Sequence, residues 1–298
     1  MDSTVATFYQ FAHLPDFEAK RAPLKEHCER HSVQGTIILA HEGINGTIAG
    51  PSAGVELVLG FIRSDERLAG LSARISDTKR MTFHRMKVVL RPEIVTLGAP
   101  EADPLEAIGE YVEPSDWNAL ISDPGVTVVD TRNDYEVGMG TFRGAIDPKT
   151  GSFGEWPEYV QQNLDPDKHP KIAMFCTGGI RCEKASAYLL KHGFRDVFQL
   201  RGGILNYLQN MPESESLWEG DCFVFDHRVS VKHGLDQGAH EICFGCRWPL
   251  TGEEMQSPQY EAGVSCPRCG GELTPERRER LRERHRQVML ARSRNEQH

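Results

Sequence analysis

The stretch Phe175–Ala185, with the sequence FCTGGIRCEKA, decides the fold of the central part of the chain. It begins at the end of a short, continuous apolar run, Lys171–Phe175, which is typical of a parallel strand covered on both faces. A helix is predicted over 181–190, so that a loop opening on Cys176 connects the strand to the helix. This order indicates an α/β domain, and such domains bind ligands at the carboxyl ends of their strands.

The loop carries the strongest chemical signal in the sequence, because it holds a thiol next to a helix N-terminus. Its two glycines let the backbone curl so that several N–H groups point inward and stabilise an anion. The same field lowers the pKa of the Cys176 thiol, and Arg181 adds a positive charge. We therefore predict a reactive thiolate, the alternative being that Cys176 is a small buried hydrophobe. The predicted anion cup is formed by Thr177, Gly178, Gly179 and Ile180.

The rest of the chain divides into segments of different pattern. Residues 1–98 alternate strand-like and helix-like stretches in the order β-α-β-β-α-β, which is typical of a ferredoxin-like unit. Residues 99–120 are rich in Pro, Glu and Asp and are predicted to be a connector with one helical turn. Residues 121–218 form the α/β domain, and 219–298 form a cysteine-rich segment that ends in a helix over 275–294. The predicted strands of the first unit are 4–11, two within 35–50, 71–75 and 86–97.

Four cysteines near the C-terminus have the spacing of a structural zinc site. Cys243 and Cys246 form one C-x2-C pair, and Cys266 and Cys269 form a second pair 19 residues further on. Four thiolates leave no open coordination position, which predicts a structural rather than a catalytic Zn²⁺. A redox dithiol pair and an iron–sulfur cluster are the alternatives.

Composition excludes several classes of protein. A hydrophobic share of 39% with 26% charged residues indicates a folded globular chain. No apolar run approaches the roughly 18 residues of a membrane span, and the N-terminus does not resemble a secretory signal. We therefore expect a cytoplasmic protein without a membrane partner, whose eight cysteines stay reduced. Cys28 is expected in the core, whereas Cys222 either packs or faces the thiol loop.

The charge of the chain is unevenly distributed. The formal net charge of −9 argues against indiscriminate binding of nucleic acid. However, residues 275–294 hold eight Arg against three Glu, and 77–91 hold five Lys or Arg against one Asp. Such segments bind phosphate by counter-ion release, although a solvated charged helix is the alternative for 275–294. The predicted RNA-binding residues are Lys79, Arg80, Arg85, Lys87, Arg91, Arg277, Arg278, Arg280, Arg282 and Arg284.

Several motifs resemble those of the rhodanese family. Besides the loop at Cys176, residues 129–136 (VDTRNDYE) are similar to the first strand and acidic turn of that family, and 200–204 (LRGGI) to its closing turn. Residues 142–146 (FRGAI) resemble its GHIPGA segment, but Thr141 or Phe142 replaces the usual His. Related phosphatases use a Cys-x5-Arg loop. The shorter Cys-x4-Arg loop here favours persulfide chemistry over phosphate hydrolysis.

Three longer stretches are similar to one branch of this family, the bacterial tRNA uridine-34 hydroxylases. They are HEGINGT at 41–47, CTGGIRCEK at 176–184 and CFVFD at 222–226. The resemblance extends over nearly the whole chain. It implies oxygen-dependent conversion of the wobble uridine to 5-hydroxyuridine, with an essential Cys176, molecular oxygen as co-substrate and the tRNA anticodon region as partner.

The residues alone do not predict hydroxylation. No set of iron ligands stands out, and no glycine-rich flavin or nicotinamide fingerprint is present. Either Cys176 adds to C6 of uracil, or a persulfide or sulfenate of Cys176 carries the oxygen, with Cys182 as a resolving thiol or a packed helix residue. Phe83 and Trp248 are candidates to stack on the extruded base. A rhodanese-type sulfurtransferase and a non-catalytic tRNA-binding adaptor are the alternative functions.

Overall fold

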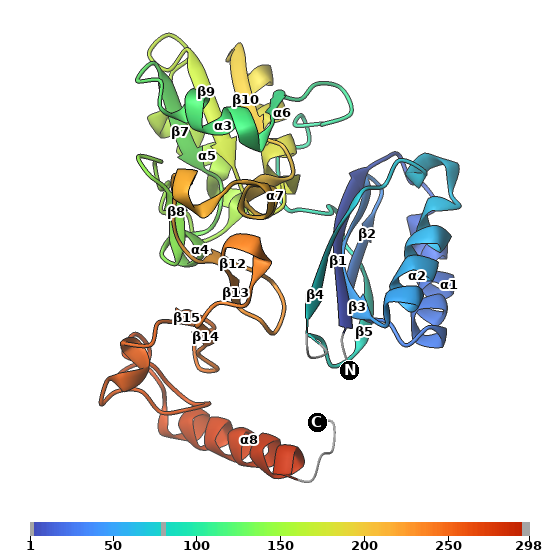
Figure 1. Ribbon diagram of the computed structural model, residues 1–298, viewed down its shortest axis with the longest axis vertical. Coiled ribbons are helices and arrows are strands. Elements are labelled where there is room, and N and C mark those ends of the chain that lie inside the picture. The colour runs from blue at the N-terminus through green and yellow to red at the C-terminus, as the bar shows by residue number, and fades with distance from the viewer. Residues whose placement is uncertain (1–2, 79–81, 294–298) are drawn as a thin grey trace.

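The computed structural model describes residues 3–78 and 82–293, which form three successive units (Figure 1). An N-terminal α+β unit is followed by a central parallel α/β unit and by a C-terminal cysteine-rich segment that ends in a long helix. Two of the predicted RNA-binding residues, Lys79 and Arg80, lie outside the described residues. Within the described part of the chain, no helix combines the length and the apolar composition needed to cross a membrane.

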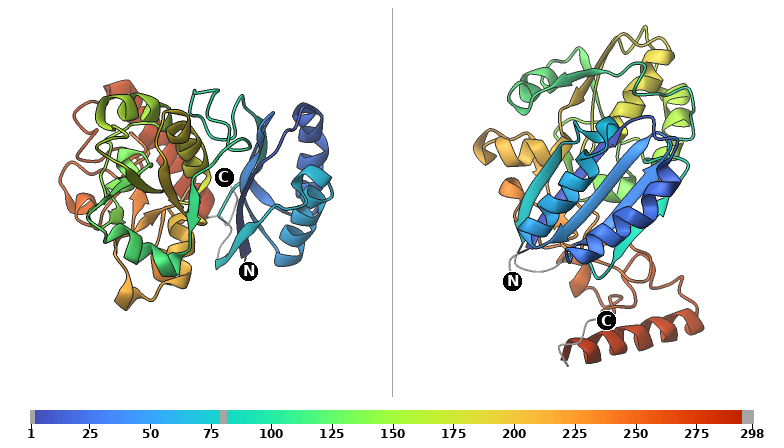
Figure 2. Two further views of the ribbon diagram at one scale, coloured as in Figure 1. Left: turned by 90° about the horizontal axis from the view of Figure 1, so that it is seen from above. Right: turned by 90° about the vertical axis from the view of Figure 1, so that its right-hand side faces the viewer.

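The N-terminal unit is a five-stranded sheet in the order β4-β1-β3-β2-β5, with two helices on one face (Figure 2). The first four strands are antiparallel and follow the predicted β-α-β-β-α-β order, and β5 adds to β2 in parallel. Strand β5 ends well before the predicted residue 97, because Pro92 lacks the N–H that a further ladder bond needs. The elements are β1 (Ser3–Phe11), α1 (Phe17–Arg30), β2 (Gln34–Ala40), β3 (Gly43–Gly50), α2 (Ser52–Arg63), β4 (Ala73–Thr78) and β5 (Met86–Leu90).

Alternation along these strands decides which side chains meet the helices. Phe8 and Ile37 pack against the apolar stripe of α2, which includes Val55 and Val58. The intervening residues point to the face without helices, which Figure 2 shows turned toward the rest of the chain. Strand register aligns one row across that face, because directly opposed residues share a face. The row is Arg74, Thr7, Thr47, Thr36 and Lys87.

The central unit is a parallel sheet in the order β6-β10-β9-β7 with helices on both sides. The predicted connector over 99–120 is not only a linker, since it contains β6 and most of α3. Strand β6 is short and polar and joins the sheet edge through three residues, so its sequence carries little strand signal. The elements are β6 (Glu110–Val112), α3 (Pro114–Ile121), β7 (Val126–Asp130), α4 (Asp134–Val137), β8 (Gly140–Phe142), α5 (Trp156–Asn163), β9 (Lys171–Phe175), α6 (Ile180–Lys191), β10 (Asp196–Leu200) and α7 (Gly203–Asn210).

The C-terminal segment consists of short hairpins and one helix. Strand β11 pairs with β8 and so attaches the segment to the central unit. Helix α8 begins at the predicted Pro275, and the hydroxyl of Thr274 caps it by accepting a hydrogen bond from the N–H of Arg277 (3.3 Å). The elements are β11 (Trp218–Gly220), β12 (Cys222–Phe223), β13 (Ser230–Val231), β14 (Glu241–Ile242), β15 (Pro249–Leu250) and α8 (Pro275–Ser293).

Candidate functional site

The loop between β9 and α6 forms a cup around the Cys176 sulfur, in which Gly179 is the one predicted cup residue whose N–H is recorded as a donor to it. Gly179 occupies the N-cap position with φ +103°, a left-handed conformation that favours glycine. This turn directs the Gly179 N–H to the Cys176 Sγ at 3.1 Å, and the N–H groups of Arg181 and Cys182 also donate to that sulfur. The side chain of Cys176 is completely buried. The cup therefore replaces water with fixed donors.

The electrostatics of the cup favour a thiolate. Burial by itself would raise the pKa of Cys176, but the Cys182 thiol, the Arg181 charge and the backbone N–H groups lower it to about 6. Burial and the neighbouring Cys176 raise the pKa of Cys182 instead. Cys182 is thus a protonated donor to Cys176 in the resting site, and its own sulfur lies 3.6 Å from the hydroxyl of Thr131.

Arg181 is held by an acidic partner that we did not predict. Its guanidinium makes a two-pronged ion pair with the carboxylate of Glu136, at 2.6 and 2.7 Å, and both side chains are buried. Burial disfavours the charged guanidinium, but Glu136 outweighs this and raises the pKa of Arg181. The hydroxyl of Thr177 lies 3.3 Å from Glu136. Arg181 therefore contributes a fixed positive charge beside the sulfur. Its guanidinium is already paired with Glu136 and is not free to bind an incoming anion.

The first residues of α7 hold the thiol loop in place through backbone hydrogen bonds. The N–H of Ile204 donates to the Cys176 carbonyl at 2.9 Å, and the N–H of Leu205 donates to the Thr177 carbonyl at 3.1 Å. Gly203 has φ +66°, and a Cβ added there would lie 2.4 Å from the Cys176 carbonyl oxygen. The closing turn of the rhodanese-like motif thus packs directly against the backbone of the thiol loop and holds it in place.

The N-terminal unit covers the cup with a tyrosine. The Tyr9 hydroxyl donates to Glu183 at 2.7 Å, and Tyr111 donates to the same carboxylate oxygen at 2.8 Å. A Cβ on Gly179 would lie 2.8 Å from the Tyr9 hydroxyl oxygen, so the phenol rests on the loop itself. Burial raises the pKa of Tyr9 well above its ordinary value, and Glu183 adds to the effect. Tyr9 therefore stays a protonated donor.

The HEGINGT stretch meets the thiol loop motif at this junction. The ammonium of Lys184 lies 2.8 Å from Glu42 and 2.5 Å from Glu93. Glu42 also accepts the N–H of Ile94 at 2.6 Å, and Asn45 donates to the Ile94 carbonyl at 3.0 Å. Two motifs that are distant in sequence thus form one contact between the N-terminal and central units.

Sequence reasoning missed Glu136, Tyr9 and Glu183. Glu136 lies inside the VDTRNDYE motif, and Glu183 lies inside CTGGIRCEK, so both were visible as unassigned acids in motifs. Nothing in the pattern around Tyr9 distinguishes it from an ordinary strand residue. At the position of the replaced His, the hydroxyl of Thr141 donates to Asp130 (2.8 Å) and Phe142 is buried in the core.

The four predicted metal ligands come together in the C-terminal segment. Their sulfur atoms lie within 4.8 Å of one another, with separations of 3.7 Å for Cys243–Cys269 and Cys246–Cys266 and 3.8 Å for Cys266–Cys269. Four sulfurs at 2.3 Å from a tetrahedral zinc ion are about 3.8 Å apart, so the cluster fits this ion. The arrangement could bind a metal, and its closed set of thiolates is compatible with structural zinc.

The remaining cysteines have structural surroundings. Cys28 is a buried residue of α1 in the core of the N-terminal unit, as expected. Cys222 packs in the core of the central unit, and burial raises its pKa to about 12. The choice left open for Cys222 is thereby decided in favour of packing.

The arginines of α8 divide into two groups. Arg278 and Arg282 pair with Glu261, and Arg277 donates to the Gly245 carbonyl at 2.9 Å. These contacts fasten the helix to the cysteine cluster. Arg280 is exposed, and Arg284 is exposed with its guanidinium 5.8 Å from the Phe244 ring.

The described cations of the second cationic segment lie on β5 and directly before and after it. Arg85, Lys87 and Arg91 are exposed. Of the two candidate stacking residues, Phe83 is half-buried, and Trp248 is half-buried with one ring face covered by Arg268 at 4.5 Å. Neither offers an open aromatic face comparable to that of Phe225, whose side chain is 60% exposed.

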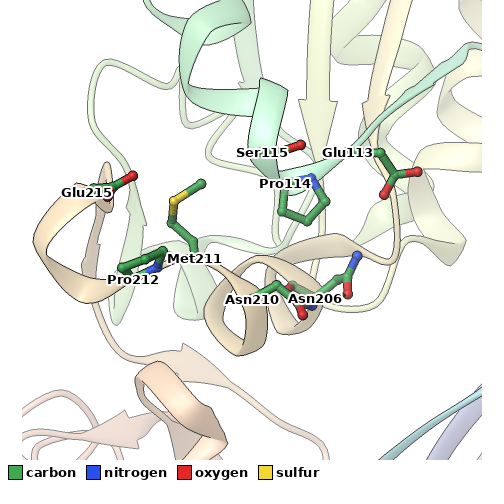
Figure 3. Close-up of a pocket in the computed structure, with 8 residues that line it drawn as sticks. All are labelled: Glu113, Pro114, Ser115, Asn206, Asn210, Met211, Pro212 and Glu215. Atoms are coloured by element: carbon green, nitrogen blue, oxygen red, sulfur yellow. Dashed lines mark hydrogen bonds between the residues drawn. The ribbon is translucent and has the colours of Figure 1, made fainter.

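A cavity of about 510 Å³ lies between α3 and α7, apart from the cup (Figure 3). Glu113 pairs with Arg201, and Asn210 donates to Asn206 at 2.8 Å, so several of its polar groups already have partners. None of the predicted site residues lines it. Its lining consists of Glu113, Pro114, Ser115, Asn206, Asn210, Met211, Pro212 and Glu215.

Comparison with known proteins agrees with this architecture. Residues 3–94 match the model of the UPF0176 acylphosphatase like domain, and residues 113–210 match that of the rhodanese-like domain. The tRNA uridine(34) hydroxylase of Picosynechococcus sp. is 54% identical over 280 residues, which are 94% of each chain. Those of Agrobacterium fabrum and Rhizobium leguminosarum are also 54% identical, over 100% and 99% of this chain and 95% of each relative. The resemblance seen in the sequence is confirmed, and the chain belongs to the tRNA uridine(34) hydroxylase family.

Proposed function

We propose that the chain hydroxylates the wobble uridine 34 of tRNA to 5-hydroxyuridine, with Cys176 as the reacting group and molecular oxygen as co-substrate. The observation that carries this proposal is the Cys176 sulfur, buried among backbone donors with its pKa lowered to about 6. Membership of a family whose relatives bear the name tRNA uridine(34) hydroxylase supports the substrate and the reaction.

The chemistry requires two electrons besides oxygen. One oxygen atom enters the base at C5, the other leaves as water, and the C5 proton is lost. Cys176 and Cys182 are hydrogen-bonded and can supply both electrons by forming a disulfide. The balance is uridine plus O₂ plus two thiols, giving hydroxyuridine, water and a disulfide. The thiolate activates the base by adding to C6, or it carries the oxygen as an oxidised sulfur.

Access to the sulfur involves the cover supplied by the N-terminal unit. Cys176 is fully buried and Tyr9 rests on Gly179, whereas Gly178 is half-buried. A flipped uracil therefore reaches the cup when Tyr9 or the loop gives way. This cover also protects the thiolate from unproductive oxidation while no tRNA is bound.

The C-terminal segment has a supporting role in this proposal. A structural Zn²⁺ held by the four cysteines fixes the hairpins to which Arg277, Arg278 and Arg282 are bound. The exposed arginines of α8, together with Arg85, Lys87 and Arg91 on and beside β5, then contact the phosphates of the anticodon region. Zinc supplies stability here and takes no part in the reaction.

The test is nucleoside mass spectrometry of tRNA from cells that lack the gene and carry the wild-type chain, Cys176→Ser or Cys182→Ser. We expect 5-hydroxyuridine and its derivatives to vanish with Cys176→Ser and to depend on oxygen during growth. Full formation with Cys176→Ser refutes the proposal. Loss of a thiolated base instead identifies a sulfurtransferase, and an unchanged nucleoside profile in the deletion identifies an adaptor.

A further inference from the structure

An exposed phenylalanine stands where the three units of the chain meet. Phe225 lies between β12 and β13, and 60% of its side chain is exposed. Phe223, two residues earlier, is buried instead. The rings of Phe223 and Phe225 meet edge-on, with their centroids 5.0 Å apart. Removing so large an apolar ring from water is favourable, so a ligand that covers Phe225 would gain free energy.

The loop that carries Phe225 is held rigidly. The Arg228 guanidinium pairs with Asp226 at 2.6 Å, and both side chains are almost entirely buried. Arg228 also donates to the Ser76 hydroxyl on β4 at 3.1 Å. The N–H of His227 donates to the Thr82 carbonyl at 3.3 Å. The loop therefore bridges to the N-terminal unit, as the converging ribbons near β4 and β13 in Figure 1 also show, and it presents Phe225 without much freedom.

The segment that this loop contacts at Thr82 continues into exposed basic side chains. The His84 and His227 rings are in contact, with centroids 4.4 Å apart, and His84 is exposed. Arg85 follows His84 directly, and Lys87 ends the row of side chains on the helix-free face of the N-terminal sheet. Arg85 and Lys87 are exposed as well. We call Phe225, His227, His84, Arg85 and Lys87 the junction patch.

A series of side-chain contacts links the loop of Phe225 to the thiol site. The Phe223 ring contacts that of Tyr135 on α4 at 5.3 Å, and the next residue, Glu136, holds Arg181 beside Cys176. A strand of RNA with one base on Phe225 would therefore lie within a few side chains of the cup.

We propose that the junction patch binds the anticodon arm of tRNA, with a base stacked on Phe225 and phosphates on Arg85 and Lys87. This inference rests on the proposed function, since it names the surface that presents the substrate to Cys176. An aromatic face flanked by cations is the chemistry by which proteins hold unpaired nucleotides. A protein partner or a second copy of the chain would be favoured by an apolar patch, whereas the other members of the junction patch are histidine, arginine and lysine side chains.

The test measures the affinity of the catalytically inactive Cys176→Ser chain for an unmodified tRNA transcript over a range of salt concentrations. We expect Phe225→Ala to raise Kd roughly 5- to 100-fold, as for one missing base stack, without changing the salt dependence. Phe225→Tyr should restore binding, and Phe225→Leu should not. The double variant Arg85→Ala/Lys87→Ala should reduce the slope of log K against log salt by about 0.7 to 0.9 for each phosphate that is no longer neutralised.

Phe61→Ala is the matched control, because Phe61 is 37% exposed on α2, on the opposite side of the N-terminal unit. A Kd of Phe225→Ala within twofold of the parent, or an equal loss of affinity with Phe61→Ala, overturns the inference. So does a change of molecular mass on gel filtration with unchanged tRNA affinity, which would identify a contact between copies of the chain. Because binding is measured without turnover, a chain that binds through Phe225 but forms no hydroxyuridine would refute the proposed function alone.

Discussion

Replacement of Cys182 by Ala tests the origin of the lowered pKa of Cys176. Burial by itself would raise the pKa of Cys176, and the largest contribution that lowers it is the hydrogen bond from the Cys182 thiol. A hydrogen bond to a charged group is worth about 1.5–3 kcal/mol, or roughly 1–2 pKa units. We therefore expect the pKa of Cys176 to rise from about 6 to roughly 7–8 in Cys182→Ala.

The consequence is a measurable loss of reactivity near neutral pH. A thiol with a pKa of about 6 is roughly nine-tenths ionised at pH 7, whereas one with a pKa of 7–8 is roughly one-half to one-tenth ionised. The rate of alkylation of Cys176 by iodoacetamide, followed on its peptide by mass spectrometry between pH 5 and 10, reports this fraction. In the wild-type chain the rate should fall as pH drops through about 6 and stay level above pH 7.

Cys182→Ser is the control, since its hydroxyl keeps a donor at the same place and should preserve most of the low pKa. The reasoning is refuted if the wild-type profile has its midpoint near the ordinary thiol value, or if Cys182→Ala leaves the midpoint unchanged. Burial of the sulfur slows its alkylation at every pH. The midpoint of each variant's own rate-against-pH profile is therefore independent of how well the reagent reaches the sulfur.

Three further variants test the supports of the site. Gly203→Ala should abolish hydroxyuridine formation and lower Tm, because its Cβ would lie 2.4 Å from a loop carbonyl; Gly144→Ala, with φ +80° and open space around it, should show the smaller cost of backbone strain alone. Glu136→Gln should lower the free energy of unfolding in urea by about 3–5 kcal/mol, because it leaves a buried guanidinium uncompensated, and Glu219→Gln, which breaks an exposed pair, should change it little. Cys266→Ser should reduce the zinc content from about one ion per chain to none in elemental analysis and make α8 sensitive to protease, and zinc-free wild-type protein with four free thiols would contradict this.

The thiol loop shows how far local sequence carries a prediction. The strand before Cys176 and the helix after it are predicted from their apolar patterns. The turn between them is predicted from two adjacent glycines, of which Gly179 has the left-handed φ of +103° that another residue would find strained. All of these signals lie within a short stretch of the chain, so the sequence predicts them directly. The four-cysteine cluster is similar, because C-x2-C fixes the geometry of each pair and only the meeting of the two pairs depends on folding.

The partners of the loop are a different matter. Tyr9 bonds to Glu183 across 174 positions of sequence, and Glu136 bonds to Arg181 across 45. Neither pairing has a local pattern, because each depends on how whole elements pack. The short strand β6 escapes prediction for the same reason, since only its neighbour β10 makes it a strand.

By itself, the sequence determined that this chain carries a cysteine in a glycine-containing loop between a strand and a helix, four thiols spaced for a metal, and cationic segments on an acidic body. Those properties depend on residue type and on short spacings, which folding does not alter. The tertiary structure decided that Arg181 is neutralised by Glu136, that the N-terminal sheet closes the cup through Tyr9, and that Phe225 is exposed on a loop that bridges to the N-terminal unit. Contacts of this kind form between elements distant in sequence, and packing of the three units against one another selects them.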